Sequence, residues 1–212
     1  MSGPRIAVVD YGMGNRRSVE KALARVRAEA VITSDHARLR DADGLVVPGV
    51  GAFPQAMRNL RALGLDDLLR ERVDAGVPVL GICLGMQLLF ERSVENEGAE
   101  GLGLLAGPVE RLEAPGLKLP HIGWNLVRFR RPSPVTETLP EAAAFYHVHT
   151  FAPVPASEED VVGVSDYGGP FVSVVADPRR PLFGVQFHPE KSSAHGLELL
   201  RGFARVCARV AA

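Results

Sequence analysis

The chain has 212 residues, of which 46% are hydrophobic and 23% charged, and its formal net charge is −1. That balance is typical of a globular protein in water. It excludes an overall positive charge that would attract nucleic acid or an anionic membrane. Two cysteines are too few for a disulfide framework, no run approaches the roughly 20 apolar residues of a membrane span, and the N-terminus lacks the apolar core of a signal peptide, so we expect a cytoplasmic protein.

Short apolar runs alternate with helical patterns through the first hundred residues. The runs predict strands over 5–10, 30–33, 43–49 and 77–82. The helical spacing predicts helices over 18–29, 53–63, 65–75 and 84–92. Strands that are apolar on both faces and alternate with helices indicate a parallel sheet covered by helices.

The pattern changes after about residue 100, where short apolar runs lie between proline and glycine turns. A last helix is predicted from about residue 193 to 209. We therefore predict one domain over residues 1–212, with an α/β fold. Its central sheet is mostly parallel and flanked by helices, and additional antiparallel strands come from the second half.

The stretch GVPVLGICLGMQLLFE, residues 76–91, places Cys83 between an apolar strand and a helix, with Gly81 and Gly85 on either side. This order is the layout of a nucleophile elbow, in which a tight turn exposes the nucleophile at the carboxyl edge of the sheet. The N-terminus of the following helix favours a thiolate, and the N–H of Leu84 is free to stabilise an oxyanion. The competing interpretation is a buried core cysteine.

The segment FGVQFHPEKSS places His188 directly after another apolar strand, with Pro189 and Glu190 next. Because proline biases the preceding residue toward an extended conformation, this tripeptide can hold Glu190 against one imidazole nitrogen while the other faces the thiol. A base that activates a thiol and a carboxylate that orients the base form a Cys–His–acid triad. The alternative is a surface histidine beside a helix-capping glutamate.

A third glycine-rich strand end is VVPGVGAF, which carries Pro48, Gly49, Val50 and Gly51. We expect its strand to lie beside that of Cys83. A glycine-rich turn exposes backbone N–H groups and can supply a second oxyanion donor. The alternative is a simple loop into the helix at Phe53.

GICLGMQLLF and GVQFHPEKS resemble motifs of the class I (triad-type) glutamine amidotransferase family, and the match runs from Asp10 to about Ser193. DYGMGN, PGVGAF, PHIGWN and FHPEKSS narrow the resemblance to glutaminase subunits of imidazole glycerol phosphate synthase, an enzyme of histidine biosynthesis. The resemblance implies the family's flavodoxin-like fold, no cofactor and no metal. It also implies that Cys83 attacks the side-chain amide of L-glutamine, that His188 shuttles protons, and that Glu190 orients His188.

The resemblance further implies a γ-glutamyl thioester on Cys83, whose hydrolysis gives glutamate, and ammonia that passes through a channel to a partner. That partner is a (β/α)₈-barrel cyclase in a heterodimer. The N–H groups of Val50 and Leu84 match the family's oxyanion hole, and the segment 48–51 is one that can rearrange to turn the Val50 N–H inward. Two further groups match by position: Gly51, Gln87, His149 and Thr150 hold glutamine, and Asn15, His121, Trp124, Asn125 and Lys191 face the cyclase.

Four positions depart from the family pattern, one of them the replacement of a serine by Thr150. His147 and Phe151 stand in a segment, YHVHTF, where the family has a pattern like Tyr-Phe-Val-His-Ser-Tyr, and Arg16 stands where an apolar residue is expected. Phe151 lacks a phenolic hydroxyl, so a hydrogen bond from that position is in doubt. Thr150 keeps a hydroxyl and a backbone N–H for recognition of the α-groups of glutamine.

Other interpretations stay open from the sequence alone. His147 and His149 share one face of a strand and, with His121 or His188, could bind zinc. A glutaminase subunit for pyridoxal phosphate synthesis, or a glutaminase domain of another synthetase, would share the triad. A catalytically silent regulatory module and a cysteine peptidase are the remaining alternatives. The motif pair PGVGAF and PHIGWN argues against the other glutaminases, and the intact triad argues against a silent module.

Overall fold

The computed structural model describes residues 3–210, and its first half alternates strands and helices. In chain order the elements are β1 (Arg5–Val9), α1 (Arg16–Arg25), β2 (Glu29–Thr33), α2 (His36–Asp41), β3 (Gly44–Gly49), α3 (Phe53–Ala62), α4 (Leu65–Asp74), β4 (Val79–Cys83) and α5 (Leu84–Leu88). The second half is mostly strands: β5 (Arg92–Ser93), β6 (Ala99–Glu100), β7 (Pro108–Arg111), β8 (His121–Phe129), β9 (Ala142–His149), β10 (Phe151–Pro153), β11 (Val161–Asp166), β12 (Pro170–Ala176) and β13 (Leu182–Val185). Two 3₁₀ turns, η1 (Glu158–Asp160) and η2 (Pro189–Lys191), precede the last helix, α6 (Ser193–Val210).

Both halves of the chain build one nine-stranded sheet in the order β2-β1-β3-β4-β13-β12-β11-β8-β9. The first five strands in that order are parallel, and the last four run antiparallel to their neighbours. The parallel part has the flavodoxin-like order, so its strands end at one edge, where α/β proteins bind ligands. The remaining strands form a small sheet, β10-β7-β5-β6. The predicted fold class is therefore confirmed.

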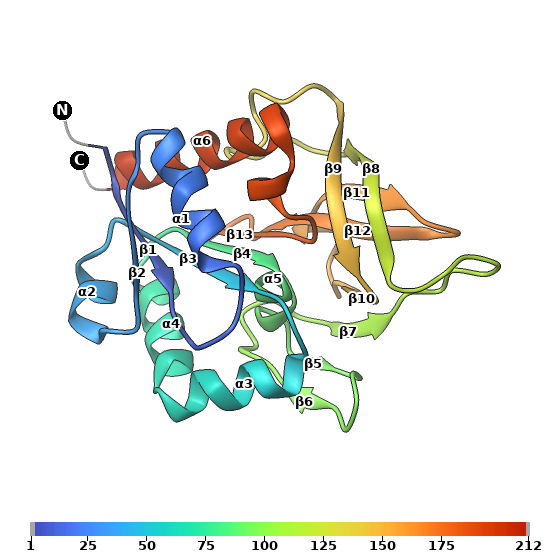
Figure 1. Cartoon of the computed structure of the whole chain (residues 1–212), viewed down its shortest axis with the longest axis horizontal. Helices are drawn as coiled ribbons and strands as arrows, with labels where there is room; N and C mark the ends of the chain where they lie inside the picture. Colours follow the sequence, from blue (N-terminus) through green and yellow to red (C-terminus); the bar gives the residue numbers. More distant parts are fainter. Residues whose placement is uncertain (1–2, 211–212) are drawn as a thin grey trace.

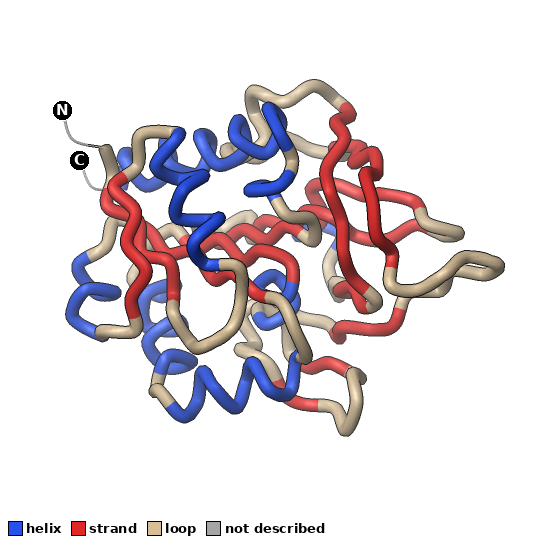
Figure 2. The backbone as a smooth tube through the Cα atoms, in the orientation of Figure 1, coloured by secondary structure: helices blue, strands red, loops and turns tan. Residues whose placement is uncertain are grey.

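Helices cover the parallel part of the sheet on both sides (Figure 1). Helices α1 and α6 lie on one face, and α2, α3 and α4 lie on the other. Successive strand residues belong to different cores: Ala7 and Val9 pack with α3, whereas Ile6 and Val8 pack with α1 and α6. This alternation is the geometric consequence of a strand buried on both faces. Figure 2 shows the strand-rich second half beside this layered part.

Several predicted boundaries are wrong, each for an identifiable reason. Helix α1 ends at Arg25 rather than residue 29, because Arg27 takes a positive φ of 67° and the chain turns into β2. Helix α5 ends at Leu88 rather than residue 92. The carbonyls of residues 88–91 accept hydrogen bonds from the N–H groups of residues 101–105, which replace a further helical turn. The six-residue α2 went unpredicted because it buries a single residue, Leu39, too few for a helical period.

The described residues include no helix with the length and apolar character needed to cross a membrane.

Candidate active site

Cys83 lies at a sharp turn between β4 and α5. Its backbone has φ 54° and ψ −112°, a conformation that is strained for any residue with a Cβ. The glycines on either side allow the turn: a Cβ on Gly85 would lie 1.8 Å from the Val47 carbonyl oxygen, and one on Gly81 would lie 2.6 Å from the Gly85 carbonyl oxygen. Such an observed strain at a strand end is typical of a nucleophile elbow. The Cys83 side chain lines a cavity although the residue is only 5% exposed.

His188 and Glu190 reach the same region from the chain after β13, which pairs with β4. Glu190 Oε1 lies 2.9 Å from His188 Nδ1, and the two side chains are 1% and 3% exposed. Burial by itself would lower the pKa of His188, but the Cys83 sulfur and the Glu190 carboxylate favour the imidazolium and raise this pKa to about 10. The structure thus brings Cys83, His188 and Glu190 together, as the sequence analysis expected of a triad.

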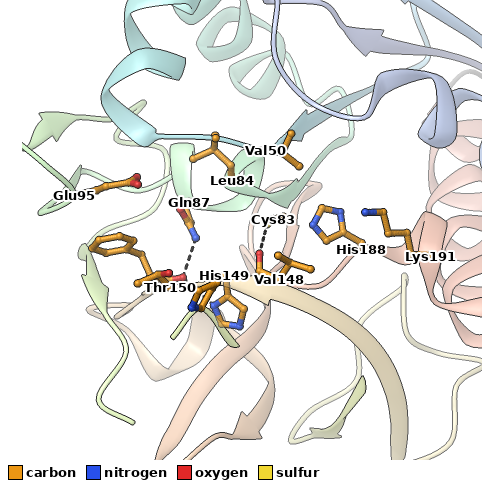
Figure 3. Close-up of a pocket in the computed structure, with 13 residues that line it drawn as sticks. Val50, Cys83, Leu84, Gln87, Glu95, Val148, His149, Thr150, His188 and Lys191 are labelled. Carbon is orange, nitrogen blue, oxygen red and sulfur yellow. Dashed lines mark hydrogen bonds between the residues drawn. The ribbon is translucent and has the colours of Figure 1, made fainter. Parts of the chain in front are cut away.

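A cavity of about 250 Å³ opens beside Cys83 and His188 (Figure 3). The three residues expected at the oxyanion hole and its turn, Val50, Gly51 and Leu84, line it. Gly49 pairs with Cys83 across β3 and β4, so the glycine-rich segment lies directly beside the nucleophile. The cavity therefore joins a thiol, a base and two candidate oxyanion segments.

The buried side chain of Tyr11 fixes the start of the glycine-rich segment. Its hydroxyl donates a hydrogen bond of 2.6 Å to the carbonyl oxygen of Pro48. Burial, and secondarily the Cys83 charge, raise the pKa of Tyr11, so the phenol stays a neutral donor. The motif YGMGN thus contributes a structural contact to this segment that the sequence analysis did not foresee.

The expected glutamine-binding residues Gln87, His149 and Thr150 all line the cavity. The Gln87 amide nitrogen lies 2.9 Å from the Phe151 carbonyl oxygen, the contact that Figure 3 marks, and 3.2 Å from Gln186 Oε1. His149 Nδ1 lies 3.0 Å from the same Phe151 oxygen. Phe151 has no side-chain hydroxyl and so makes no side-chain hydrogen bond. Its main-chain carbonyl oxygen instead contacts both Gln87 and His149.

Glu95, which no sequence motif marks, also lines the cavity with its side chain. The backbone N–H of Phe53 donates to Glu95 Oε2 at 2.8 Å and holds the carboxylate in place. Figure 3 shows Glu95 beyond Gln87, at the far side of the cavity from His188. Glu95 lies in an irregular segment between β5 and β6, where no periodicity marks it. Its position comes from the contact with Phe53, 42 residues earlier.

Three histidines, His121, His147 and His149, cluster at one wall of the cavity, which His149 lines, and their ring nitrogens contact other protein groups. His121 Nδ1 lies 3.1 Å from His149 Nε2, and His147 lies 3.1 Å from both the Phe145 carbonyl oxygen and Ser173 Oγ. Among residues 3–210 no group of three or more His, Cys, Asp or Glu is arranged to hold a metal ion. The contacts therefore explain these histidines as hydrogen-bonded core residues, not as the zinc ligands of the alternative interpretation.

The buried histidines make the protein sensitive to acid. Burial, with smaller effects of the neighbouring imidazoles, lowers the pKa of His147 to about 2 and of His149 to about 3. Each is therefore neutral when folded but protonated when unfolded below its ordinary pKa of about 6.5. Because the unfolded chain then binds more protons, the free energy of unfolding falls as the pH drops below about 6.5.

Replacing His147 by phenylalanine should remove one of these titrations. The free energy of unfolding, measured in urea at pH 7 and pH 5.5, should fall between the two pH values by about 1 kcal/mol less in His147→Phe than in the unmodified chain. Ser173 keeps its contact with Ser165 at 2.8 Å, so no buried hydroxyl is left alone. An unchanged pH dependence in His147→Phe would contradict a neutral buried imidazole.

The residues expected to face a partner do not share one surface. Trp124 is 55% exposed on β8, whereas His121 is 3% exposed and points inward. The two are three residues apart on a strand and so lie on opposite faces, which corrects the placement of His121. Asn125 donates from Nδ2 to the Asp166 carbonyl oxygen and lies 3.4 Å from His121 Nε2. Asn15 is the N-cap residue of α1, and Lys191 Nζ lies 5.9 Å from the centre of the Tyr146 ring.

The structure explains Arg16, which the sequence analysis could not. Its guanidinium forms an ion pair with the Asp10 carboxylate, and both side chains are about one-third exposed. Asp10 also accepts a hydrogen bond from the Gly12 N–H. The polar residue at position 16 is therefore matched by the aspartate at the end of β1, and the pair spans the YGMGN turn.

The fold and the site together define a class of protein. A buried thiol at a strained strand–helix turn, with an imidazole and a carboxylate at the next strand end, is the geometry of thiol-dependent acyl transfer on an α/β fold.

Comparisons with known proteins agree with that class. Residues 7–206 match the family model for glutamine amidotransferase class-I. Over 95% of its length the chain is 50% identical to imidazole glycerol phosphate synthase subunit HisH of Moorella thermoacetica and 48% identical to that of Aquifex aeolicus, covering 94% and 96% of those proteins. A crystal structure of a glutamine amidotransferase superposes with a TM-score of 0.73 at 23% identity, covering 95% of this chain and 98% of that one. The chain belongs to the class I glutamine amidotransferase family, as its motifs predicted.

Proposed function

We propose that the chain is the glutaminase subunit of imidazole glycerol phosphate synthase. It hydrolyses L-glutamine to glutamate and ammonia and delivers the ammonia to a (β/α)₈-barrel cyclase subunit. The cyclase uses this ammonia to form the imidazole ring. Two findings support the proposal: half of the aligned residues are identical to a HisH subunit, and one cavity joins Cys83, His188 and Glu95. That cavity, with Glu190 behind His188, is the observation that carries the proposal.

The reaction follows from the positions of these groups. The Cys83 thiolate attacks the side-chain carbonyl carbon of glutamine, and the developing oxyanion is stabilised by the N–H groups of Leu84 and Val50. His188, as an imidazolium, protonates the departing nitrogen, so the C–N bond breaks and ammonia leaves a thioester on Cys83. Neutral His188 then takes a proton from water, which attacks the thioester and releases glutamate. Glu190 keeps the imidazole oriented and stabilises its charged form.

Recognition of the amino-acid end of glutamine is assigned to the far side of the cavity. An α-ammonium group requires an anionic partner, and the Glu95 carboxylate lines the cavity at a distance from the reacting thiol. Thr150 and the N–H of Gly51 are the candidate partners of the α-carboxylate. Gln87 and His149 complete the wall, through the shared Phe151 oxygen.

The cyclase is proposed to cover the exposed face of β8. Ile122, Trp124 and Leu126 alternate along this strand and are 59%, 55% and 41% exposed. Trp124 packs edge-on against Tyr146, which lies beneath Lys191, a residue that lines the cavity, so the apolar face continues toward the site where ammonia is formed. An exposed aromatic anchor among aliphatic residues is typical of an interface centre. A partner seated there can receive ammonia without its passage through bulk water.

Residues 1–212 are proposed to act as one glutaminase domain that needs no cofactor. The cytoplasmic location expected from the sequence stays a prediction. A glutaminase subunit of another synthase would react with a glutamine analogue but would not respond to the cyclase, so the test uses both.

A glutamine-analogue alkylator tests the proposal directly. In the complex with the barrel cyclase and its nucleotide substrate, the reagent should add once to the chain, at Cys83, and abolish glutaminase activity. Excess L-glutamine should protect against labelling, whereas a dipeptide with an internal glutamine should not. Labelling that is absent in the complex, or that is blocked by peptides and not by glutamine, would overturn the proposal. Cys207 serves as an internal control because it is fully buried on α6.

A further inference from the structure

Gln186 is a fully buried polar residue that the proposed reaction has not used. It follows β13, two residues before His188, and is 0% exposed. Its Nε2 lies 3.7 Å from the sulfur of Cys83, and its Oε1 lies 3.2 Å from Gln87 Nε2. A buried amide is costly unless its groups are paired, so this position, directly between the nucleophile and the glutamine-binding wall, needs an explanation.

A backbone carbonyl fixes which end of the Gln186 amide faces the sulfur. The Phe151 carbonyl oxygen can only accept, so the Gln87 nitrogen, and not its oxygen, must face it at 2.9 Å. That same nitrogen lies against Gln186 and can only donate, so the Gln186 oxygen must face Gln87. The remaining end of Gln186, its NH₂ group, is thereby directed at Cys83. Two amide orientations follow from one main-chain oxygen.

The two contacts of the Cys83 sulfur serve different protonation states. The Val148 carbonyl oxygen lies 3.7 Å from the sulfur and can accept a hydrogen bond only from the protonated thiol. The Gln186 N–H can donate to the sulfur after the proton has left. Since a donor that pairs with the charged form stabilises that form, Gln186 favours the thiolate whereas Val148 favours the thiol.

We infer, building on the proposed glutaminase reaction, that Gln186 is a further catalytic residue whose amide N–H stabilises the Cys83 thiolate. The proton of the thiol passes to His188, and the electron pair left on sulfur is the one that attacks glutamine. No additional reactant is needed. After the thioester forms, the sulfur has lost its charge and the hydrogen bond weakens, so Gln186 favours sulfur as the leaving group when water attacks.

A histidine pair extends this arrangement toward β8. His149 Nδ1 faces the Phe151 oxygen and so carries a hydrogen, which leaves Nε2 of the neutral ring to accept from His121 Nδ1. His121 Nε2 in turn faces the Nδ2 of Asn125. His149, His121 and Asn125 are therefore positioning residues: they hold the Phe151 oxygen against which the amides of Gln87 and Gln186 are oriented.

The pH dependence of Cys83 alkylation by iodoacetamide tests Gln186, with the full chain in complex with its cyclase. The titratable groups that interact electrostatically with the sulfur are His188 and Tyr11, and Glu95, His149 and Lys191 line the cavity; none of them is replaced in Gln186→Met, Gln186→Glu or Ser173→Ala. Gln186→Met keeps the side-chain length and removes the N–H donor. The midpoint of alkylation should rise by about one pH unit, and alkylation well below the midpoint should slow about tenfold. The kcat of the glutaminase should fall more than its KM rises.

Gln186→Glu is the second variant. Its side chain has nearly the same shape as glutamine, so it tests the inference even if Gln186→Met does not fold. A carboxylate oxygen against the thiolate should raise the midpoint by more than one unit. Ser173→Ala is the matched control, because Ser173 is also fully buried and hydrogen-bonded but lies beside His147 rather than Cys83. Its midpoint should stay that of the unmodified chain.

Unchanged midpoints in folded Gln186→Met and Gln186→Glu would overturn the inference. So would a Ser173→Ala midpoint that moves as far as that of Gln186→Met, since loss of any buried hydrogen bond would then suffice. Either result leaves the glutaminase proposal standing so long as the glutamine analogue still labels Cys83. Absence of that labelling in the unmodified chain instead removes the proposed function itself, so the two failures are distinguishable.

Discussion

Replacing Cys83 by serine should lower glutamine-dependent synthesis in the cyclase complex by about 10⁴-fold or more, while synthesis from added ammonia continues near its original rate. The serine hydroxyl has too high a pKa to form an anion here, whereas the Cys83 thiol forms the thiolate that His188 and Gln186 stabilise. The variant therefore forms no acyl intermediate. The cyclase chemistry does not involve Cys83 and depends only on a supply of ammonia. Both rates are measured on the same complex, with glutamine or an ammonium salt at high pH as nitrogen source.

The matched control is Cys207→Ala, because Cys207 is buried on α6 against Gly44 and burial raises its pKa. This variant should keep the glutamine-dependent rate and lose only packing energy. Loss of the glutamine-dependent and ammonia-dependent rates together in Cys83→Ser would contradict delivery of ammonia from this site to a separate cyclase. Loss of the glutamine-dependent rate in Cys207→Ala would contradict the assignment of the nucleophile.

The strand–helix alternation and the elbow could be predicted from the sequence because both depend on neighbours in the chain. Apolar runs on both faces specify the parallel strands, and a Cβ on Gly81 would strike the carbonyl oxygen of its near neighbour Gly85. The end of α5 could not be predicted in the same way. It is set by hydrogen bonds to residues 101–105, which only the folded chain places beside Leu88 and Leu89.

The residues of the candidate site also fall into those that a local motif predicts and those that only distant contacts define. Cys83, His188 and Glu190 stand in motifs whose residue types suggest their chemistry. The role of Gln186 could not be predicted from the sequence. It depends on contact with Gln87, 99 residues away, and on the backbone carbonyl of Phe151, which no residue type reveals. Glu95 is likewise defined by its contact with the Phe53 N–H. The inward placement of His121, in contrast, was available from strand alternation, since Trp124 on the same strand is exposed.

The strain at Cys83 and the unpaired oxygen of Glu190 point to one property of the site. Cys83 has a positive φ, and Glu190 Oε2 is buried without a hydrogen-bond partner among the described residues. Either feature costs folding free energy, of the order of 1–3 kcal/mol. Both lie at the groups that carry the chemistry, which is where a protein retains such costs when activity depends on them.

Replacing Glu190 by glutamine should therefore separate stability from activity. Glutamine removes a carboxylate whose second oxygen is unpaired, but it also removes the ion pair with the His188 imidazolium, so the two effects oppose each other and the midpoint of thermal unfolding should change little. The glutaminase rate in the complex should fall by about 10³-fold, because the imidazolium of His188 loses its charged partner. His188→Ala removes the base itself and should cost more, about 10⁵-fold.

The pH profile checks that Glu190 acts through His188. The Glu190 carboxylate contributes to the raised His188 pKa of about 10, so Glu190→Gln lowers that pKa. The imidazolium that protonates the departing nitrogen is then lost at a lower pH, and the alkaline limb of kcat/KM should move to lower pH. Equal losses in Glu190→Gln and His188→Ala, or an alkaline limb that stays in place, would mean that Glu190 does not orient and charge His188.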